Sequence, residues 1–330
     1  MNELLVEQEE IQLLLNILGE DITISYPLSG IDILSSLPVP GGYSLKFSAT
    51  EKLDEASYLF GVYKDEVPTS KDLRECLINS GIYTFSNMDE IGKKMREYRR
   101  MPKSVKFSPD TNMLYFNVVS SHRLLKTTEI VMVDTVLDEI KGKINRKYKE
   151  NDIREISQLA PYRGDLFKEL MNKRKKVSRT ANIAQKEYNL MKGDAVSIKG
   201  TTQDDPDRAI ADALEAYERE QHTDVVMLTA DDAMVSLCEA DNIGYIKCDL
   251  PHEITDVECD HDKFTHLIKN MASMMGLIKL GPAVVYGEYR KYTANNPDRL
   301  KVKIEDHKRY SELKKELELC RKLRSLEIEQ

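Results

Sequence analysis

The sequence contains no apolar run that approaches the roughly 18 residues needed to cross a bilayer. Its first residues, MNELLVEQEEIQLLL, interrupt the leucines with acids, which excludes the uniform hydrophobic core of a secretory signal peptide. Both absences lead us to expect a soluble, cytoplasmic protein with no membrane partner.

Cysteine and net positive charge are also scarce. The five cysteines are odd in number and scattered, which disfavours a disulfide framework. The formal net charge is −8, whereas overall basicity is the usual electrostatic footprint of a nucleic-acid-binding chain. Basic residues are nevertheless concentrated locally, in residues 93–100, 141–149 and 173–179. Any contact with a polyanion would therefore depend on local patches.

The composition that remains is that of a globular protein. Hydrophobic residues make up 41% and charged residues 32% of the 330 residues, enough for a sizeable core and for two domains. Apolar spacing predicts a helix over residues 3–18, and the alternating segments ITISYPL and YSLKFSA predict strands separated by the turn PVPGG. Helical spacing returns over residues 70–101. We place a boundary near Pro102 and expect residues 1–102 to form a small α+β module of unknown role.

Beyond Pro102, short apolar strands alternate with helices, which indicates an α/β fold with a doubly wound, Rossmann-like parallel sheet over residues 103–260. A long polar and basic region at about 150–195 reads as helical. Residues 261–330 are expected to be a C-terminal extension that packs on this domain and ends in a charged helix. Packing of that helix within the chain is the favoured interpretation, and a homodimer formed through its leucines is the alternative.

Acidic residues follow two of the expected strands directly. Asp110 ends SVKFSPD and Asp231 ends DVVMLTAD. Glu139 lies on the helix after the second expected strand, and Asp207 begins the helix that leads into the Asp231 strand. In open parallel sheets, ligands bind outside the carboxyl ends of the strands. Carboxylates gathered there repel one another, and a hard divalent cation such as Mg²⁺ relieves the repulsion. The chemistry that matches this is metal-assisted phosphodiester hydrolysis, because no nucleophile is paired with a histidine nearby.

Four segments in order resemble the motifs of PIN-domain nucleases. SPDTNMLY resembles the first motif and carries Asp110, and VDTVLDEI resembles the second and carries Glu139. DRAIADALEAY resembles the third, with Asp207 at a helix start, and VVMLTADDAM resembles the fourth, with Asp231 in a Thr-x-Asp frame. Each motif is weak alone, whereas four in order are specific together. The likeness covers about residues 103–260.

The resemblance implies a metal-dependent endoribonuclease that hydrolyses single-stranded RNA. Its implied catalytic and metal-binding residues are Asp110, Glu139, Asp207 and Asp231, which would hold one or two Mg²⁺ or Mn²⁺ ions. A metal-activated water would attack the phosphodiester and leave a 5′-phosphate and a 3′-hydroxyl. Asp207 lies 68 positions after Glu139, a longer gap than a compact domain of this family needs, so residues of about 150–195 are expected to be a helical insertion.

Neighbouring residues compete for some of these roles. Asp138 is the alternative to Glu139, and the third acid could instead be one of Asp204, Asp205 and Asp212. An acid that precedes a helix is also an ordinary N-cap or first-turn charge. We expect supporting roles near the acids for four further residues, which are Asn112, Thr229, Asp212 and Asp232.

For the substrate backbone we favour the run NKRKKVSR, because it contains no acids. Its expected substrate-binding residues are Lys173, Arg174, Lys175, Lys176 and Arg179. Three other interpretations of the same sequence are open. The chain could be a toxin-type PIN ribonuclease neutralised by a small antitoxin, a non-catalytic RNA-binding scaffold, or a nuclease that cleaves DNA flaps.

Overall fold

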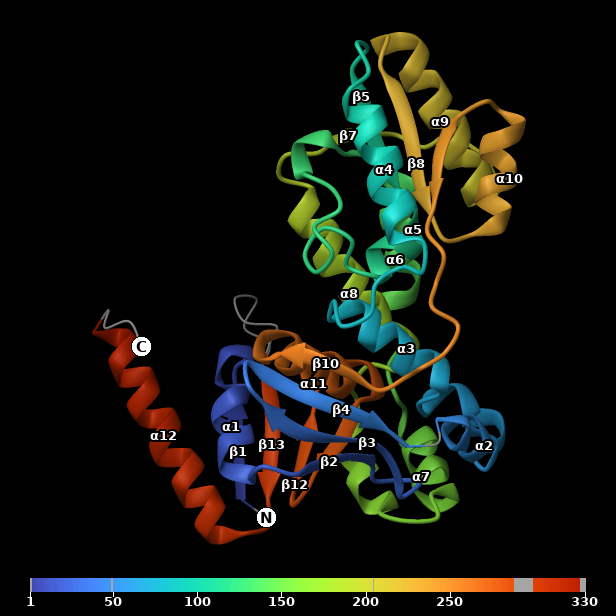
Figure 1. The fold of residues 1–330 in the computed structure, drawn as a ribbon. Coiled ribbons are helices and arrows are strands. Elements are labelled where there is room, and N and C mark those ends of the chain that lie inside the picture. The colour runs from blue at the N-terminus through green and yellow to red at the C-terminus, as the bar shows by residue number, and fades with distance from the viewer. Residues whose placement is uncertain (1, 49, 204, 288–298, 327–330) are drawn as a thin grey trace. The chain divides into compact units, whose positions relative to one another are not determined.

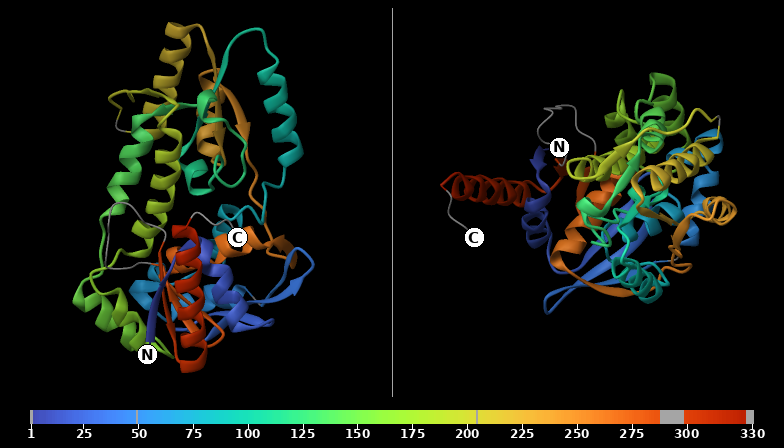
Figure 2. Two further views of the ribbon diagram at one scale, coloured as in Figure 1. Left: turned by 90° about the vertical axis from the view of Figure 1, so that its left-hand side faces the viewer. Right: turned by 90° about the horizontal axis from the view of Figure 1, so that it is seen from above.

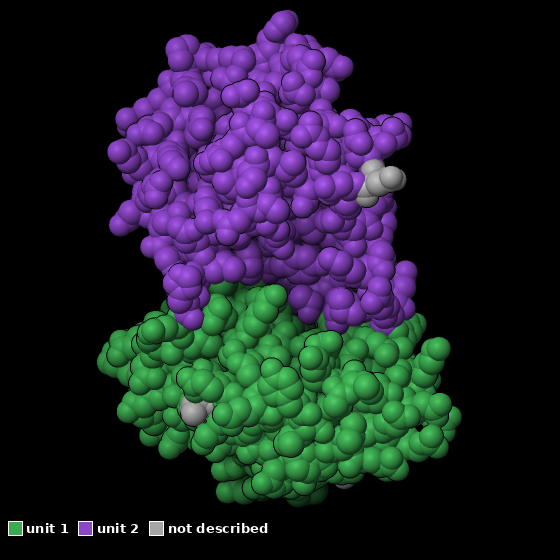
Figure 3. All heavy atoms as spheres, turned by 90° about the vertical axis from the view of Figure 1, so that its right-hand side faces the viewer, with its two compact units in different colours: residues 1–82, 147–176, 253–330 green, residues 83–146, 177–252 purple. Residues whose placement is uncertain are grey.

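The computed structural model describes residues 2–48, 50–203, 205–287 and 299–326, and the chain divides into two compact units, which are coloured separately in Figure 3. Unit 1 comprises Met1–Ile82, Lys147–Lys176 and Glu253–Gln330, and unit 2 comprises Tyr83–Arg146 and Val177–His252. Among the described residues, no helix is both long and apolar enough to cross a membrane.

Unit 1 is built on an antiparallel sheet of eight strands in the order β1-β13-β12-β11-β2-β3-β4-β10 (Figure 1). The strands are β1 (Asn2–Val6), β2 (Ile22–Tyr26), β3 (Ile31–Val39), β4 (Gly42–Phe47), β10 (Val257–Asp260), β11 (Leu277–Leu280), β12 (Ala283–Tyr286) and β13 (Leu300–Ile304). The alternation expected in ITISY is present, because every second residue of β2 is buried. Gly41 has a φ of +85° in the PVPGG turn, a conformation that glycine adopts without steric cost.

Helices cover this sheet and complete unit 1. They are η1 (Gln8–Glu10), α1 (Ile11–Leu18), α2 (Glu51–Tyr58), η2 (Gly61–Glu66), α3 (Ser70–Asn79), α7 (Glu150–Leu159), η4 (Gly164–Leu170), α11 (His261–Met275) and α12 (His307–Ser325). Helix α11 packs against β4, β10, β11 and β12 (Figures 1 and 2). It does so because Phe264, Leu267, Ile268 and Met271 fall on one helical face, and all four are fully buried.

The described residues of unit 2 form five parallel strands. The pairs β5 (Val105–Pro109) with β8 (Asp224–Thr229) and β8 with β9 (Gly244–Lys247) form one sheet, and β6 (Val131–Val133) pairs with β7 (Val196–Ile198). A parallel bridge between Phe107 and Ile130 joins β5 to the second group. Residues 225–228 of β8 are at most 1% exposed, as expected for a parallel strand covered on both faces. These findings confirm an α/β fold for the region.

Unit 2 also contains helices, most of which contact these strands. They are α4 (Met88–Arg99), α5 (Thr111–Tyr115), η3 (Thr127–Glu129), α6 (Asp134–Ile144), α8 (Lys176–Met191), α9 (Pro206–Gln221) and α10 (Asp232–Ala240). Helix α8 begins at the last residue of the middle segment of unit 1. Helices α5, α6, α9 and α10 all contact strands of the parallel arrangement. Helices α5, α6 and α10 begin just after the ends of β5, β6 and β8, whereas α9 ends just before β8 begins.

The expected domain boundaries need correction. The boundary predicted at Pro102 lies after Ile82, because α4 buries Ile91 and Met95 in unit 2 and the side chain of Asn87 bonds the backbone after β9. The expected insertion at 150–195 is divided. Residues 147–176 belong to unit 1, and the remainder of α8 belongs to unit 2.

Residues 261–330, which we expected to be an extension of the nuclease domain, belong to unit 1. Strand β13 pairs with β1, β11 pairs with β2, and α12 contacts α1, so this extension completes the sheet of unit 1. The terminal helix does pack within the chain, with Leu313 and Leu317 buried. The helix predicted over residues 3–18 begins only at Ile11, since residues 2–6 form β1 against a strand nearly 300 residues away.

Candidate functional site

The carboxyl ends of β5 and β8 bring two acids to one edge of the sheet. These strands are parallel neighbours, with Pro109 paired to Leu228, and Asp110 and Asp231 follow them. Each acid is also the N-cap of the next helix: Asp110 caps α5 by accepting from the Thr111 N–H, and Asp231 caps α10 by accepting from the Ala233 N–H. The strand-to-helix turn therefore fixes both side chains at this edge.

Thr229 links the two acids. Its side chain is fully buried, its Oγ1 donates to Asp110 Oδ2 at 2.9 Å, and the same oxygen accepts from the Asp231 N–H at 2.9 Å. Asn112 Nδ2 also donates to Asp110 Oδ2, at 3.3 Å. The Asp110 carboxylate, 3% exposed, thus accepts hydrogen bonds from two side chains and one backbone N–H. This network holds it in one orientation.

Glu139 joins the same site from α6. Its Oε2 accepts a hydrogen bond from the hydroxyl of Thr111, the residue that follows Asp110. Its competitor Asp138 is exposed and forms an ion pair of 3.3 Å with Lys141 on the same helix. The structure therefore places Glu139, and not Asp138, beside the first acid.

Asp207 lies at the start of α9 and is half-buried. Burial raises its pKa, and the nearby carboxylates of Glu139, Asp205 and Asp231 raise it further. Asp205 serves as the N-cap of α9, accepting from the Asp207 N–H at 3.1 Å, as expected for an acid before a helix. Asp204, the other candidate, lies outside the described residues.

The carboxyl of Asp110 has a strongly raised pKa. Burial raises its pKa from 3.8 to about 6, the hydrogen bonds from Thr229 and Thr111 oppose that rise, and the charges of Asp207 and Glu139 add to it. Electrostatic interactions therefore connect the four predicted acids, with Asp231 connected through Asp207. Repulsion among them is only partly relieved by hydrogen bonds.

Two residues expected to support the site are directed to other partners. Asp212 pairs with Arg208 at 2.8 Å, one turn away on α9. Asp232 has a side chain that is 84% exposed and pairs with Lys247 at 2.6 Å. Asn112 and Thr229, in contrast, both contact Asp110.

Asp134 is a further acid at the carboxyl end of a strand that our sequence analysis did not single out. It follows β6, and its Oδ1 accepts from the Gly200 N–H at 2.7 Å. A Cβ on Gly200 would meet Thr135 Oγ1 at 2.0 Å, so a larger residue here would force the Thr135 side chain or the backbone to shift. The signal was available, because VMVD repeats the pattern of an apolar strand followed by an acid that selected Asp110.

The oxygen-only ligand set suits a hard divalent cation. Among the described residues, no three His, Cys, Asp or Glu side chains converge closely enough to enclose an ion. Mg²⁺ does not require such a cage, since it is usually bound by one or two carboxylates together with waters and substrate phosphates. The buried, partly uncompensated charge of Asp110 fits that mode of binding.

The predicted phosphate-binding run, Lys173 to Arg179, does not form an exposed basic surface. It is divided between the units, and Lys173, Lys176 and Arg179 are buried. Lys176 Nζ pairs with Asp72 Oδ2 at 2.7 Å, and Lys175 pairs with Asp152 at 3.1 Å, while Arg174 is half-buried. The run reads as exposed in the sequence because its acidic partners lie elsewhere in the chain.

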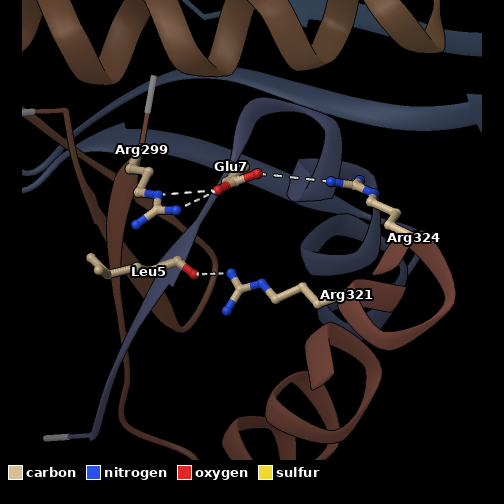
Figure 4. A pocket seen from close by; sticks show the side chains of 5 residues that line it. All are labelled: Leu5, Glu7, Arg299, Arg321 and Arg324. Atoms are coloured by element: carbon tan, nitrogen blue, oxygen red, sulfur yellow. Dashed lines mark hydrogen bonds and ion pairs between the residues drawn. The ribbon is translucent and has the colours of Figure 1, made fainter. Parts of the chain in front are cut away.

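Unit 1 has a pocket of its own, shown in Figure 4, that is lined by Leu5, Glu7, Arg299, Arg321 and Arg324. Its three arginines are matched by carboxylates. Arg299 pairs with Glu7 at 2.8 Å, Arg321 pairs with the buried Glu10 at 2.7 Å, and Arg324 pairs with Glu9 at 3.0 Å. These ion pairs tie β1 and η1 to α12 and to the residue before β13.

The family comparison agrees with the geometry of the acidic site. Residues 107–246 match the family model described as PIN domain, a range that contains all four acids and all five parallel strands except the first two residues of β5 and the last residue of β9. No curated protein matches the chain significantly.

Proposed function

The chain carries a PIN domain at residues 107–246, and we propose that this domain is a metal-dependent endoribonuclease that cleaves single-stranded RNA. PIN domains are generally nucleases, and the finer assignment rests on the acidic site. The observation that carries it is the crowding of Asp207 and Glu139 around the buried Asp110, whose pKa rises to about 6. The hydrogen bonds to Asp110 offset only part of this electrostatic cost, and a bound cation would offset more of it.

The strand arrangement supports the same proposal. Joined through the bridge at Phe107, the strands take the order β7-β6-β5-β8-β9, which is that of a doubly wound, Rossmann-like sheet. From β5 the chain adds β6 and β7 on one side of the sheet and then crosses back to add β8 and β9 on the other side. The direction of strand addition therefore reverses between β5 and β8. Ligands of such sheets bind at that switch point. Asp110 and Asp231 lie there.

In the proposed mechanism, Asp110 is the central ligand of Mg²⁺ or Mn²⁺, with Glu139, Asp207 and Asp231 as its companions. Such an ion, when bound, lowers the pKa of a coordinated water and neutralises charge on a phosphodiester. Thr229 and Asn112 fix the Asp110 carboxylate, so that its position does not depend on the ion. The raised pKa values of Asp110 and Asp207 also favour proton uptake at the site as pH falls.

Cleavage of a labelled single-stranded RNA by the full chain tests the proposal. We expect cleavage with Mn²⁺ and none with EDTA, and products that carry a 3′-hydroxyl. Asp110→Asn should abolish cleavage, whereas Asp138→Asn, which changes an exposed acid next to Glu139, should retain it. Full activity of Asp110→Asn would refute the site. Equal cleavage of single-stranded DNA would refute the restriction to RNA.

A further inference from the structure

Side chains of helices α5 and α6 make two contacts, one helical turn apart. The first contact joins Thr111 to Glu139 within the acidic site. The second joins Tyr115 to Lys143, whose Nζ lies 6.0 Å from the centre of the tyrosine ring. Both partners of the second contact are four residues beyond those of the first, which corresponds to about 6 Å along a helix. Residues four apart share a helix face.

This second contact presents two groups of complementary chemistry. Lys143 is exposed and Tyr115 is half-buried. An exposed lysine can neutralise a phosphate, and a tyrosine ring offers a face on which a nucleobase can stack. Among the described residues, Lys143 forms no ion pair, whereas Lys141 and Lys176 each form one with an aspartate. Its charge is therefore available to a ligand.

We propose that Lys143 and Tyr115 bind the nucleotide adjacent to the scissile phosphodiester, with Lys143 on its phosphate and Tyr115 stacked on its base. This inference rests on the proposed nuclease function and names the substrate class of that same site. A base in a duplex is stacked on both faces, so Tyr115 can accept only an unpaired base. The pair thus selects single-stranded nucleic acid beside the carboxylates.

The test measures binding in the full chain carrying Asp110→Asn and without divalent ions, so that cleavage does not interfere. The probes are a short fluorescent oligouridylate and an abasic oligomer of the same length. Tyr115→Leu should weaken binding of the oligouridylate by about tenfold, the scale of one lost base–aromatic stack, and leave the abasic oligomer nearly unaffected. Tyr115→Phe keeps the ring and should retain the affinity.

Lys143→Gln should weaken binding of both probes, because both carry phosphates. The slope of log affinity against log salt should fall in magnitude by about 0.7, the value for one phosphate contact on a single strand. Lys141→Gln is the matched control. It removes the same charge from the same helix at a position that pairs with Asp138, and it should leave the slope unchanged.

The inference is overturned if Tyr115→Leu affects both probes equally, or if Lys143→Gln and Lys141→Gln behave alike. Failure of the proposed function is distinguishable. If the variants show the predicted binding pattern but the wild-type chain cleaves no RNA with Mn²⁺, the nuclease function is refuted and the binding role of Lys143 and Tyr115 stands. A chain that cleaves RNA while the four variants bind like their parent would refute only the pair.

Discussion

Asp110→Asn is expected to stabilise the folded protein near pH 8 while it abolishes cleavage. The carboxylate is 3% exposed, and its pKa in the folded chain is about 6 against an ordinary value of 3.8. A folded-state pKa above the unfolded value means that the folded state binds the proton more tightly. Stability therefore falls as pH rises from about 4 to about 6, and the deficit is complete above that range.

The magnitude follows from the same shift. At 1.36 kcal/mol for each pKa unit, the rise from 3.8 to about 6 corresponds to about 3 kcal/mol of destabilisation by the ionised carboxylate. Asparagine removes the charge but replaces one acceptor oxygen with a donor, where Thr229 and Asn112 both donate. That mismatch costs about 1–2 kcal/mol. We therefore expect Asp110→Asn to raise the free energy of unfolding by about 1–2 kcal/mol above pH 7.

Urea unfolding at pH 8 and pH 4 is the assay. The increase in unfolding free energy of Asp110→Asn over the wild type should be present at pH 8. It should disappear, or change sign, at pH 4, where the wild-type carboxyl is largely protonated. Asp138→Asn is the control and should change the unfolding free energy by less than about 0.5 kcal/mol at either pH. The view that the ionised Asp110 carboxylate destabilises the fold would be refuted by either of two results. One is a lower unfolding free energy of Asp110→Asn at pH 8, and the other is an increase that does not depend on pH.

Three other substitutions probe the remaining parts of the structure. Thr229→Val removes the buried hydroxyl that bridges two acids, and we expect urea unfolding to show a loss of about 1–3 kcal/mol together with slower Mn²⁺-dependent cleavage. Gly200→Ala would place a Cβ 2.0 Å from Thr135 Oγ1, so calorimetry should show weaker Mn²⁺ binding as the loop before α9 is displaced. Lys176→Met leaves Asp72 without its buried partner and should cost about 3–5 kcal/mol in urea unfolding.

Each of these has a matched control. Thr229→Ser retains the hydroxyl and should recover most of the activity that valine loses. Gly193→Ala adds a methyl group where nothing lies within 4 Å, and it should not change Mn²⁺ affinity. Lys175→Met breaks a more exposed ion pair and should cost less than about 1 kcal/mol. If Lys176→Met lowered RNA affinity without loss of stability, the lysine would be a substrate ligand after all.

Local sequence patterns were sufficient for the parallel sheet and for the order of its acids. SVKFSPD and DVVMLTAD each combine a buried strand with an acid directly after it, and in a parallel sheet such residues reach the same edge. The family match at residues 107–246 confirms the recognition made from those motifs. The sequence alone could not show which side chains converge on Asp110, because Thr111 and Glu139 come into contact only when α5 and α6 pack together.

Long-range pairing could not be predicted from the same patterns. Leu4 and Leu5 fit the helical spacing of the residues after them, yet they belong to β1, because β13 offers them a partner that local spacing cannot show. The run around Lys176 has no acids in its own sequence. Lys176 instead forms an ion pair with Asp72, which lies in a different one of the three chain segments that make up unit 1.

Anomalous diffraction from crystals soaked in Mn²⁺ tests the central claim most directly. We predict a peak bounded by Asp110 and at least one of Glu139, Asp207 and Asp231, with manganese–oxygen distances of about 2.0–2.2 Å. The same soak of Asp110→Asn crystals should lose that peak. Saturating Mn²⁺ with no peak among these four carboxylates would contradict the assignment of this site as the metal centre of a nuclease.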